Sequence, residues 1–310
     1  MKTKRWLGRP RKLLYKVARR GHLADAIRLL DQEVDVNEAS PRGETPLYLA
    51  LAHHHPRVAL ELVRRGADVN RPGPHGSYAL HLLHWLPEES TAVTLAEEIL
   101  ARGAVVDALD DDGFAPLHFA VQDSRYKLAE LLLSHGADIN RQSFNHESPI
   151  GFAACWGHTD MARFLIQHGA DVNAEEEGVT AVMRAAQWGQ AGVLKLLVDA
   201  GATVSIPHPW RRQPPLTLAA MFGSAACVSL LLAAGADPAA TDDDGRTALD
   251  YARDWAGTNL SQKLRDLYGP GRVKRLRVGL EVHLEHALRR GTIQVKANHF
   301  DEIVALLQTK

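Results

Sequence analysis

A turn of the form Gly-Ala-Asp-Val-Asn recurs along this chain of 310 residues, and its spacing constrains the fold more than any other feature. Successive turns lie 33, 37, 33, 33, 32 and 34 residues apart. The residues at the Asn position are Asn37, Asn70, Asp107, Asn140, Asn173, Ser205 and Ala239. Such a period indicates one supersecondary unit repeated along the chain, with neighbouring units burying a common core.

A second motif lies upstream of each turn and predicts the start of a helix. It reads GETPLYLAL from Gly43, GFAPLHFAV from Gly113, GVTAVMRAA from Gly178 and GRTALDYAR from Gly245. A Thr before the helix can cap backbone N–H groups, and a Pro suits the first helical position, where no N–H is needed. A second helix follows in each unit and ends at a Gly, which readily takes the left-handed conformation.

The period and the two motifs resemble the ankyrin repeat over about residues 13–268. The resemblance implies an all-α dominated repeat solenoid, an array of about eight helix-turn-helix repeats joined by β-hairpin loops. Residues 1–12 then form a basic N-terminal segment and residues 269–310 a basic C-terminal appendage. The second helix of repeat eight is expected in NLSQKLRDLY (259–268). The appendage fits either a degenerate helix pair, with FDEIVALL (300–307) as its second helix, or a small β–α element.

Some repeats depart from the pattern. Repeat three carries four extra residues around LPEEST (86–91), which predicts a longer turn between its helices. Repeat five has His146 in place of the hairpin Gly, and repeat seven replaces its hairpin by PHPWRRQPP (207–215). His81 and His118 stand at the motif His, which the resemblance assigns a structural role in tying neighbouring hairpins together.

Charge is distributed unevenly along the chain. Residues 1–20 contain nine basic and no acidic residues, and residues 271–310 contain eight basic and four acidic residues. The body between them has a net charge of −14. The basic ends allow an alternative function, a nucleic-acid-associated protein that contacts phosphates through residues 2–16 and 272–277. The acidic body opposes a continuous nucleic-acid track, and a role of the N-terminal segment at a membrane surface is a further alternative.

No sequence motif predicts catalysis, a cofactor or a metal. Phosphate-binding and nucleotide-binding glycine motifs and the Gly-x-Ser-x-Gly nucleophile motif are absent. Adjacent residues such as His53, His54 and His55 do not share a helix face, and EVHLEH (281–286) lacks the spacing of a zinc motif. Cys155 has no base supplied by a motif. The two cysteines form no disulfide framework, no signal peptide or membrane-spanning run is evident, and a cytoplasmic protein is expected.

The repeat register also aligns an aromatic row. The residue just before the turn between the two helices is Trp156, Trp188, Phe222 and Trp255 in the last four repeats. The resemblance places this position and the one before it on the concave groove, where ankyrin repeats contact ligands. Exposed aromatic residues commonly mark binding surfaces, but stacking that braces the array is the alternative.

Acidic triplets at the hairpin tips give a second signal, because the resemblance places the tips at the edge of the same groove. Asp before Gly is ordinary turn chemistry, but three full triplets exceed what a turn requires. Aromatic rings beside carboxylates suit a basic, partly apolar partner. The predicted function is therefore non-enzymatic binding of a protein or peptide in the groove of repeats four to eight. The predicted partner-binding residues are Trp156, Trp188, Phe222, Trp255, Asp123, Gln122, Gln187, Met221, Asp111, Asp112, Phe114, Glu176, Glu177, Trp210, Arg211, Asp243 and Asp244.

Overall fold

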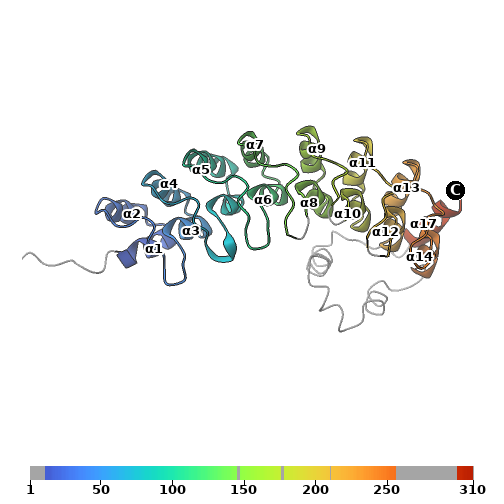
Figure 1. Cartoon of the computed structure of the whole chain (residues 1–310), viewed down its shortest axis with the longest axis horizontal. Coiled ribbons are helices and arrows are strands. Elements are labelled where there is room, and N and C mark those ends of the chain that lie inside the picture. Colours follow the sequence, from blue (N-terminus) through green and yellow to red (C-terminus); the bar gives the residue numbers. More distant parts are fainter. Residues whose placement is uncertain (1–10, 145–146, 176–177, 210, 256–298, 310) are drawn as a thin grey trace, which may run out of the picture. The chain divides into compact units, whose positions relative to one another are not determined.

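A computed structural model describes residues 11–144, 147–175, 178–209, 211–255 and 299–309 of the chain (Figure 1). The chain divides into two compact units, Met1–Phe144 and Asn145–Lys310, which we call the N-terminal and C-terminal units. Both are built from consecutive helix pairs, and the predicted all-α dominated repeat array is confirmed. None of the described helices has the length and apolarity needed to cross a lipid bilayer.

The N-terminal unit contains repeats one to four. Its elements are α1 (Arg11–Arg20), α2 (Leu23–Leu30), α3 (Pro46–Ala52), α4 (Pro56–Arg64), η1 (Pro74–Gly76), η2 (Ala79–Trp85), α5 (Glu89–Ala101), α6 (Pro116–Gln122) and α7 (Tyr126–Ser134). The first helices of the repeats, α1, α3, η2 and α6, pack in sequence against one another. The second helices, α2, α4, α5 and α7, form a second row, which lies above the first in Figure 1.

The C-terminal unit repeats this two-row arrangement. Its elements are α8 (Pro149–Trp156), α9 (Thr159–Gln167), α10 (Ala181–Gln187), α11 (Ala191–Asp199), α12 (Pro215–Met221), α13 (Ala225–Ala233), α14 (Ala248–Trp255) and α17 (His299–Gln308). The first helices α8, α10, α12 and α14 stack on one another, and α9, α11 and α13 form the second row. Each helix buries an apolar face between the rows, as Leu165, Leu197 and Leu231 show, all fully buried.

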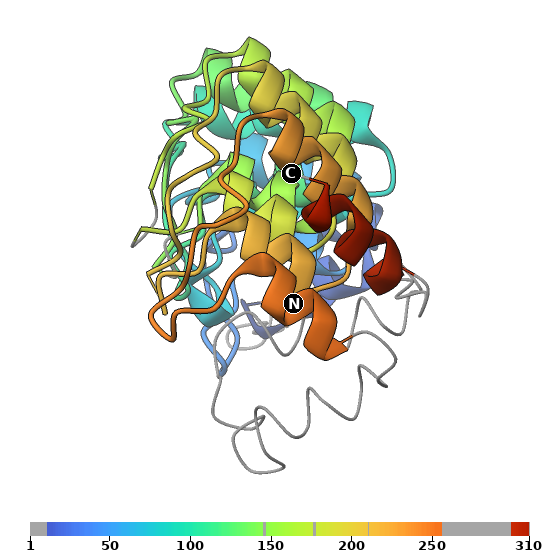
Figure 2. The ribbon, with the colours of Figure 1, turned by 90° about the vertical axis from the view of Figure 1, so that its right-hand side faces the viewer.

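Helix α17 takes the place of the second helix of repeat eight. It packs against α14 and α13, just as α13 packs against α12 and α11, and Figure 2 shows it beside both helices at the end of the unit. Phe300, Ile303 and Leu307 point into this contact and are buried. The expected helix over 300–307 is therefore confirmed. The helix expected over 259–268, and the choice between a helix pair and a β–α element before residue 299, lie outside the described residues.

Helix starts follow the capping chemistry that the motif predicts. The Thr45 hydroxyl accepts a hydrogen bond from the Tyr48 N–H at 3.1 Å, and Ser148 caps α8 in the same way. In repeats three and four a His replaces this cap: Nδ1 of His81 accepts the Tyr78 N–H, and Nδ1 of His118 accepts that of Ala115. Nε2 of His81 donates to the Phe114 carbonyl at 2.9 Å, which ties repeat three to repeat four as expected.

The loops between repeats are held by the residues that set the register. Asn37 accepts the Asp68 N–H, Asn70 accepts the Val105 N–H and Asp107 accepts the Asp138 N–H, each one repeat further along. No β-strand forms among the described residues. The loops close by single backbone bonds, such as Asp110 N–H to Phe114 O, and by isolated bridges such as that between Thr241 and Thr247. The expected β-hairpins are therefore tight turns with too few cross-bonds to make strands.

The expected longer turn in repeat three is wrong. Three residues, 86–88, separate η2 from α5, as in repeat two, where 53–55 separate α3 from α4. The four extra residues instead lengthen the second helix, since α5 has 13 residues and α4 has 9. Glu89 lies in the first turn of α5, where a negative charge is favoured by the helix dipole. Its carboxylate also accepts the Lys127 N–H of α7 at 2.8 Å, which fixes the longer helix to its neighbour.

Candidate functional site

In the C-terminal unit, three of the four predicted aromatic residues are described with their side chains. Trp156, Trp188 and Phe222 lie at the C-terminal ends of α8, α10 and α12, and all three are half-buried. The Trp156 ring is tilted against Phe152 of its own helix, with ring centroids 6.5 Å apart. These side chains thus use one flank for packing and leave the remainder accessible. The side chain of Trp255 lies outside the described part of the chain.

The positions just before the aromatic row differ in exposure. Gln187 is half-buried, but Met221 is only 6% exposed. The Met221 side chain therefore packs inside the repeat and offers little surface to a partner.

A buried ion pair lies beside the aromatic row and was not predicted from the sequence. Arg184 of α10 donates to Glu147 at 3.3 Å, and both side chains are largely buried. The same guanidinium nitrogen lies 3.7 Å from the Cys155 sulfur, and the Gln190 amide donates to the Cys155 carbonyl. These bonds join repeats five and six just behind Trp156. Arg184 falls on a variable position of the helix motif, and Glu147 in an irregular hairpin, so neither stood out in the sequence.

The acidic tips separate into structural and exposed residues. Asp242 is buried, and its carboxylate accepts the Tyr251 hydroxyl at 2.6 Å and the N–H groups of Asp244 and Arg246. Burial raises the pKa of Asp242, but these hydrogen bonds outweigh it and hold the pKa below its ordinary value. Asp110 closes the tip of repeat four in the same way, through the N–H groups of Asp112 and Phe114. The first acid of each of these tips therefore shapes its turn.

The later acids of the tips are exposed. Asp111 and Asp112 project from repeat four, and Asp243 and Asp244 from repeat eight. Arg211 interrupts the acidic pattern by pairing with Asp244 at 2.9 Å, so part of the predicted acidic edge is neutralised within the chain. The predicted residues Glu176, Glu177 and Trp210 lie outside the described residues.

In the N-terminal unit, the ends of the first helices bring Asp123 and Gln122 of repeat four close to repeat three. Asp123 is exposed and Gln122 half-buried, and Asp123 accepts a hydrogen bond from Nδ1 of His84 at 2.8 Å. Phe114 is half-buried between His118 and Phe119. Asp123 thus anchors a buried histidine as well as facing solvent.

Trp85 is a surface aromatic that the predicted site omits. Its side chain is 48% exposed at the end of η2, and its ring lies 5.3 Å from the His84 ring. The sequence signal for it existed, since Trp85 aligns with Gln122, Gln187 and Met221 in the repeat register. The register placed Leu86 in the aromatic column instead, and Leu86 is fully buried.

The described residues contain no cluster of three or more potential metal ligands. A family model of a single ankyrin repeat matches residues 42–73 and 112–144. A model of three copies matches residues 141–208, and a model of many copies matches residues 216–253. The chain is an ankyrin-repeat protein. Ankyrin repeats generally mediate protein–protein interaction, and the fold is typically a non-enzymatic module.

Similar proteins share the repeats over part of their length. The sequence is 32% identical over 119 residues to the E3 ubiquitin-protein ligase hecd-1 of Caenorhabditis elegans, covering 38% of this chain and 4% of that protein. It is 32% identical over 96 residues to the human ARF GTPase-activating protein GIT1, covering 29% of this chain and 13% of that one. This ankyrin-repeat protein therefore spans only a small share of the length of either relative.

A solved structure covers more of the chain. The crystal structure of the ankyrin repeat domain of Bcl-3, a member of the IkappaB protein family, superimposes with a TM-score of 0.60 at 28% identity. The match covers 71% of this ankyrin-repeat protein and 97% of that domain.

The His84–Asp123 contact predicts a pH dependence of stability. Burial lowers the pKa of His84 below its ordinary value of 6.5, and the bond to Asp123 raises it only partly back. Since the unfolded chain takes up a proton more readily at His84, the stability of the fold falls as the pH drops through about 6.5. Thermal midpoints at constant salt should decrease from about pH 7.5 to about pH 5.5.

A His84→Gln variant should show a shallower decrease than the wild type. His81 is shifted in the same direction by burial and should leave a residual slope in that variant. A wild-type midpoint that rises on acidification would contradict the assignment.

Proposed function

We propose that this ankyrin-repeat protein binds a protein or peptide partner without catalysing a reaction, and that the contact surface is formed by the ends of the first helices. The observation that carries the proposal is the row of Trp156, Trp188 and Phe222, half-buried at equivalent positions of three consecutive repeats. Large rings at the surface of a monomer are costly unless they bury area against a partner.

Exposed carboxylates on the tips of each unit support a basic, partly apolar partner. Asp243 is exposed on a loop of the C-terminal unit, and Asp111 and Asp112 are exposed on a loop of the N-terminal unit. Carboxylates at the rim of an interface accelerate association with a cationic partner, and aromatic rings hold arginine and lysine side chains by cation–π contacts. We infer that the N-terminal unit contributes its own contacts through Trp85 and Asp123.

The proposal predicts that Trp156→Ala and Trp188→Ala lose binding without losing the fold. Each truncation should reduce affinity by about tenfold or more, because a hot-spot aromatic contributes on the order of 2 kcal/mol. The measurement pairs a thermal melt with fluorescence anisotropy of a short labelled peptide of alternating arginine and leucine. A peptide with glutamine in place of arginine tests the contribution of charge.

Phe164→Ala is the matched control, because Phe164 is also a half-buried aromatic of repeat five but lies on the second helix α9. It should leave peptide affinity unchanged. The opposite result identifies a structural brace: a loss of about 3–5 kcal/mol of stability in Trp156→Ala, typical of a core aromatic, with peptide affinity equal to wild type.

A further inference from the structure

The turns between the first and second helices of repeats one and two form a basic surface, whose residues are not among those named for the proposed function. We call it the basic ridge; it comprises Arg19, Arg20, His22, His53, His54, His55 and Arg57. All of these residues except His55 are exposed. The sequence contains no acidic residue from 1 to 24 or from 45 to 60, so neither turn carries a compensating charge of its own.

Contacts of His55 join the two turns into one surface. Its Nε2 donates to the Arg19 carbonyl at 3.1 Å, and its ring covers Gly21 so closely that a Cβ there would lie 2.4 Å from Nδ1. His54 stands at the tip of its turn in a left-handed backbone conformation with a φ of 58°. The guanidinium and imidazole groups of two repeats therefore face solvent side by side.

Acidic groups near the ridge offset only part of its charge. Asp25 pairs with both His22, at 3.7 Å, and Arg28, at 3.2 Å. Glu44 accepts the Ser40 hydroxyl at 2.8 Å.

The electrostatics at His53 show the same balance. Burial has the largest effect on the pKa of His53 and lowers it, and the neighbouring Arg19, His55 and His54 lower it further. Glu44 alone raises it. His53 thus adds positive charge to the ridge as the pH falls below the ordinary histidine value of 6.5.

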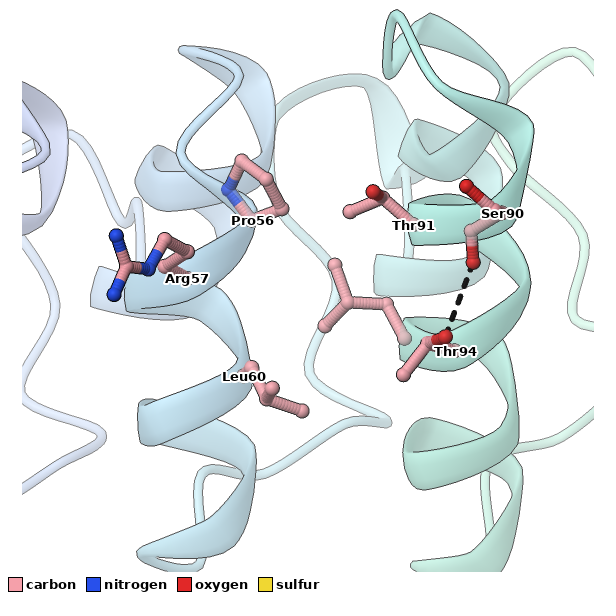
Figure 3. A pocket seen from close by; sticks show the side chains of 7 residues that line it. Pro56, Arg57, Leu60, Ser90, Thr91 and Thr94 are labelled. Carbon is pink, nitrogen blue, oxygen red and sulfur yellow. Dashed lines mark hydrogen bonds between the residues drawn. The ribbon is translucent and has the colours of Figure 1, made fainter.

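An open cleft adjoins the ridge on the other side of α4. It has a volume of about 210 Å³ and lies between α4 and α5 (Figure 3). It is lined by Pro56, Arg57, Leu60, Ser90, Thr91, Thr94 and Leu95. In Figure 3 the guanidinium of Arg57 points away from α5 and the cleft, and the hydroxyl of Thr94 is turned to the Ser90 carbonyl, to which it donates at 3.0 Å.

The lining of the cleft is more apolar than polar. Leu60 contributes to it from α4 and Leu95 from α5, and the hydroxyl side chains at the α5 wall are Ser90, Thr91 and Thr94. A cavity of about 150 Å³ lined by apolar groups admits a benzene ring, so the volume suits a leucine or phenylalanine side chain.

We propose that the basic ridge and the adjoining cleft bind an acidic peptide segment that inserts one apolar side chain between α4 and α5, with higher affinity at acidic pH. The carboxylates of the peptide contact the Arg and His side chains of the ridge. Pro56 and Arg57 are adjacent in the chain and link the ridge to the cleft. This partner is opposite in charge to the one proposed for the aromatic row.

A peptide fits the surface better than a nucleic acid does. The positive charge covers the turns of two repeats only, because Glu88 and Glu89 follow at the start of α5, and a nucleic acid gains affinity from a row of phosphate contacts. The cleft, by contrast, requires an apolar group beside the acids. The acidic residues at the start of α5 also set the direction of the peptide, because they repel its carboxylates from the α5 side of the cleft.

The test uses the full chain and a fluorescein-labelled peptide of glutamates with one leucine, measured by anisotropy. Affinity should rise roughly three- to tenfold from about pH 8 to about pH 5, because several exposed charge pairs each contribute modestly. Arg57→Gln and His53→Gln should each weaken binding, and His53→Gln should also flatten the pH dependence. Thr94→Phe, at an exposed position, should weaken binding by filling the cleft.

Lys127→Gln is the control, because Lys127 is an exposed base on α7 of the same unit. It should bind as wild type does, and a peptide with serine in place of leucine should bind more weakly. The proposal is overturned if affinity is equal at both pH values, if the ridge variants bind like Lys127→Gln, or if a labelled oligothymidylate binds more tightly than the peptide. The last result would assign the ridge to nucleic acid.

Discussion

An Ile303→Asp variant is expected to release α17 and destabilise the end of the C-terminal unit. Ile303 is fully buried against α13 and α14, and a carboxylate there would lack a partner. An uncompensated buried charge costs about 3–5 kcal/mol, but the loss cannot exceed the free energy with which α17 docks, because the helix can detach instead. Hydrogen exchange should show lost protection in α17, α14 and α13, and the thermal midpoint should fall.

Ala305→Asp provides the matched control, since it adds the same charge to the exposed face of the same helix. It loses at least as much helix propensity, because alanine is a better helix former than isoleucine, and it does so without removing an apolar contact. Equal melting and exchange behaviour of the two variants would show that α17 does not dock on α13 and α14. Phe300 offers independent support, because its ring lies against the turn at Gly223 and its truncation should uncover that turn.

The origin of α17 shows what a repeat pattern can and cannot specify. Phe300, Ile303 and Leu307 lie on one helix face, and their spacing predicted a second helix of a repeat. The segment 259–268 directly follows α14 and was assigned to the same position by adjacency. Docking is decided by the free energy of burial rather than by chain order, because the entropic cost of bringing two segments together grows only slowly with their separation in sequence. The period alone could not therefore select the helix that completes repeat eight.

Within the regular repeats, the sequence predicted both the helices and their connections. Thr45 and Pro46 act through local capping chemistry, which depends on a few neighbouring residues and is visible in any single repeat. The role of Asn37 and Asn70, which reach the next loop, depends on the stacking of repeats. The period located these residues, but only the packed array shows what their side chains contact.

The exposure of the aromatic row was less predictable. The register identifies which residues end the first helices, but a rotation of one residue separates Trp85, which is exposed, from Leu86, which is fully buried. Repeat three makes this turn with a 3₁₀ helix, which winds more tightly than an α-helix and moves the last side chain around the axis. Met221 is buried by similar local packing. Alignment therefore gives the position of a candidate contact residue but not the direction of its side chain.

A Gly113→Ala variant is expected to destabilise the N-terminal unit far more than a Gly136→Ala variant. Both glycines have a positive φ, 78° at Gly113 and 88° at Gly136, so each alanine is strained by about 1–2 kcal/mol in the left-handed region. The space around them differs. A Cβ at Gly136 meets nothing within 4 Å, whereas a Cβ at Gly113 would lie 2.4 Å from the Phe144 nitrogen and 2.5 Å from its ring.

The second cost at Gly113 arises from the loop that packs over it. The Phe144 N–H donates to the Asp112 carbonyl at 3.1 Å, so a methyl group that pushes the Phe144 backbone away also breaks this bond. Overpacking adds about 1–3 kcal/mol to the strain, for a total of about 2–5 kcal/mol, measurable as a shift of the urea midpoint. Equal losses in the two variants would mean that Phe144 does not hold its place over Gly113. A larger loss at Gly113 would show that the acidic tip of repeat four is fixed by the next loop, and that Asp111 and Asp112 are presented on a rigid turn.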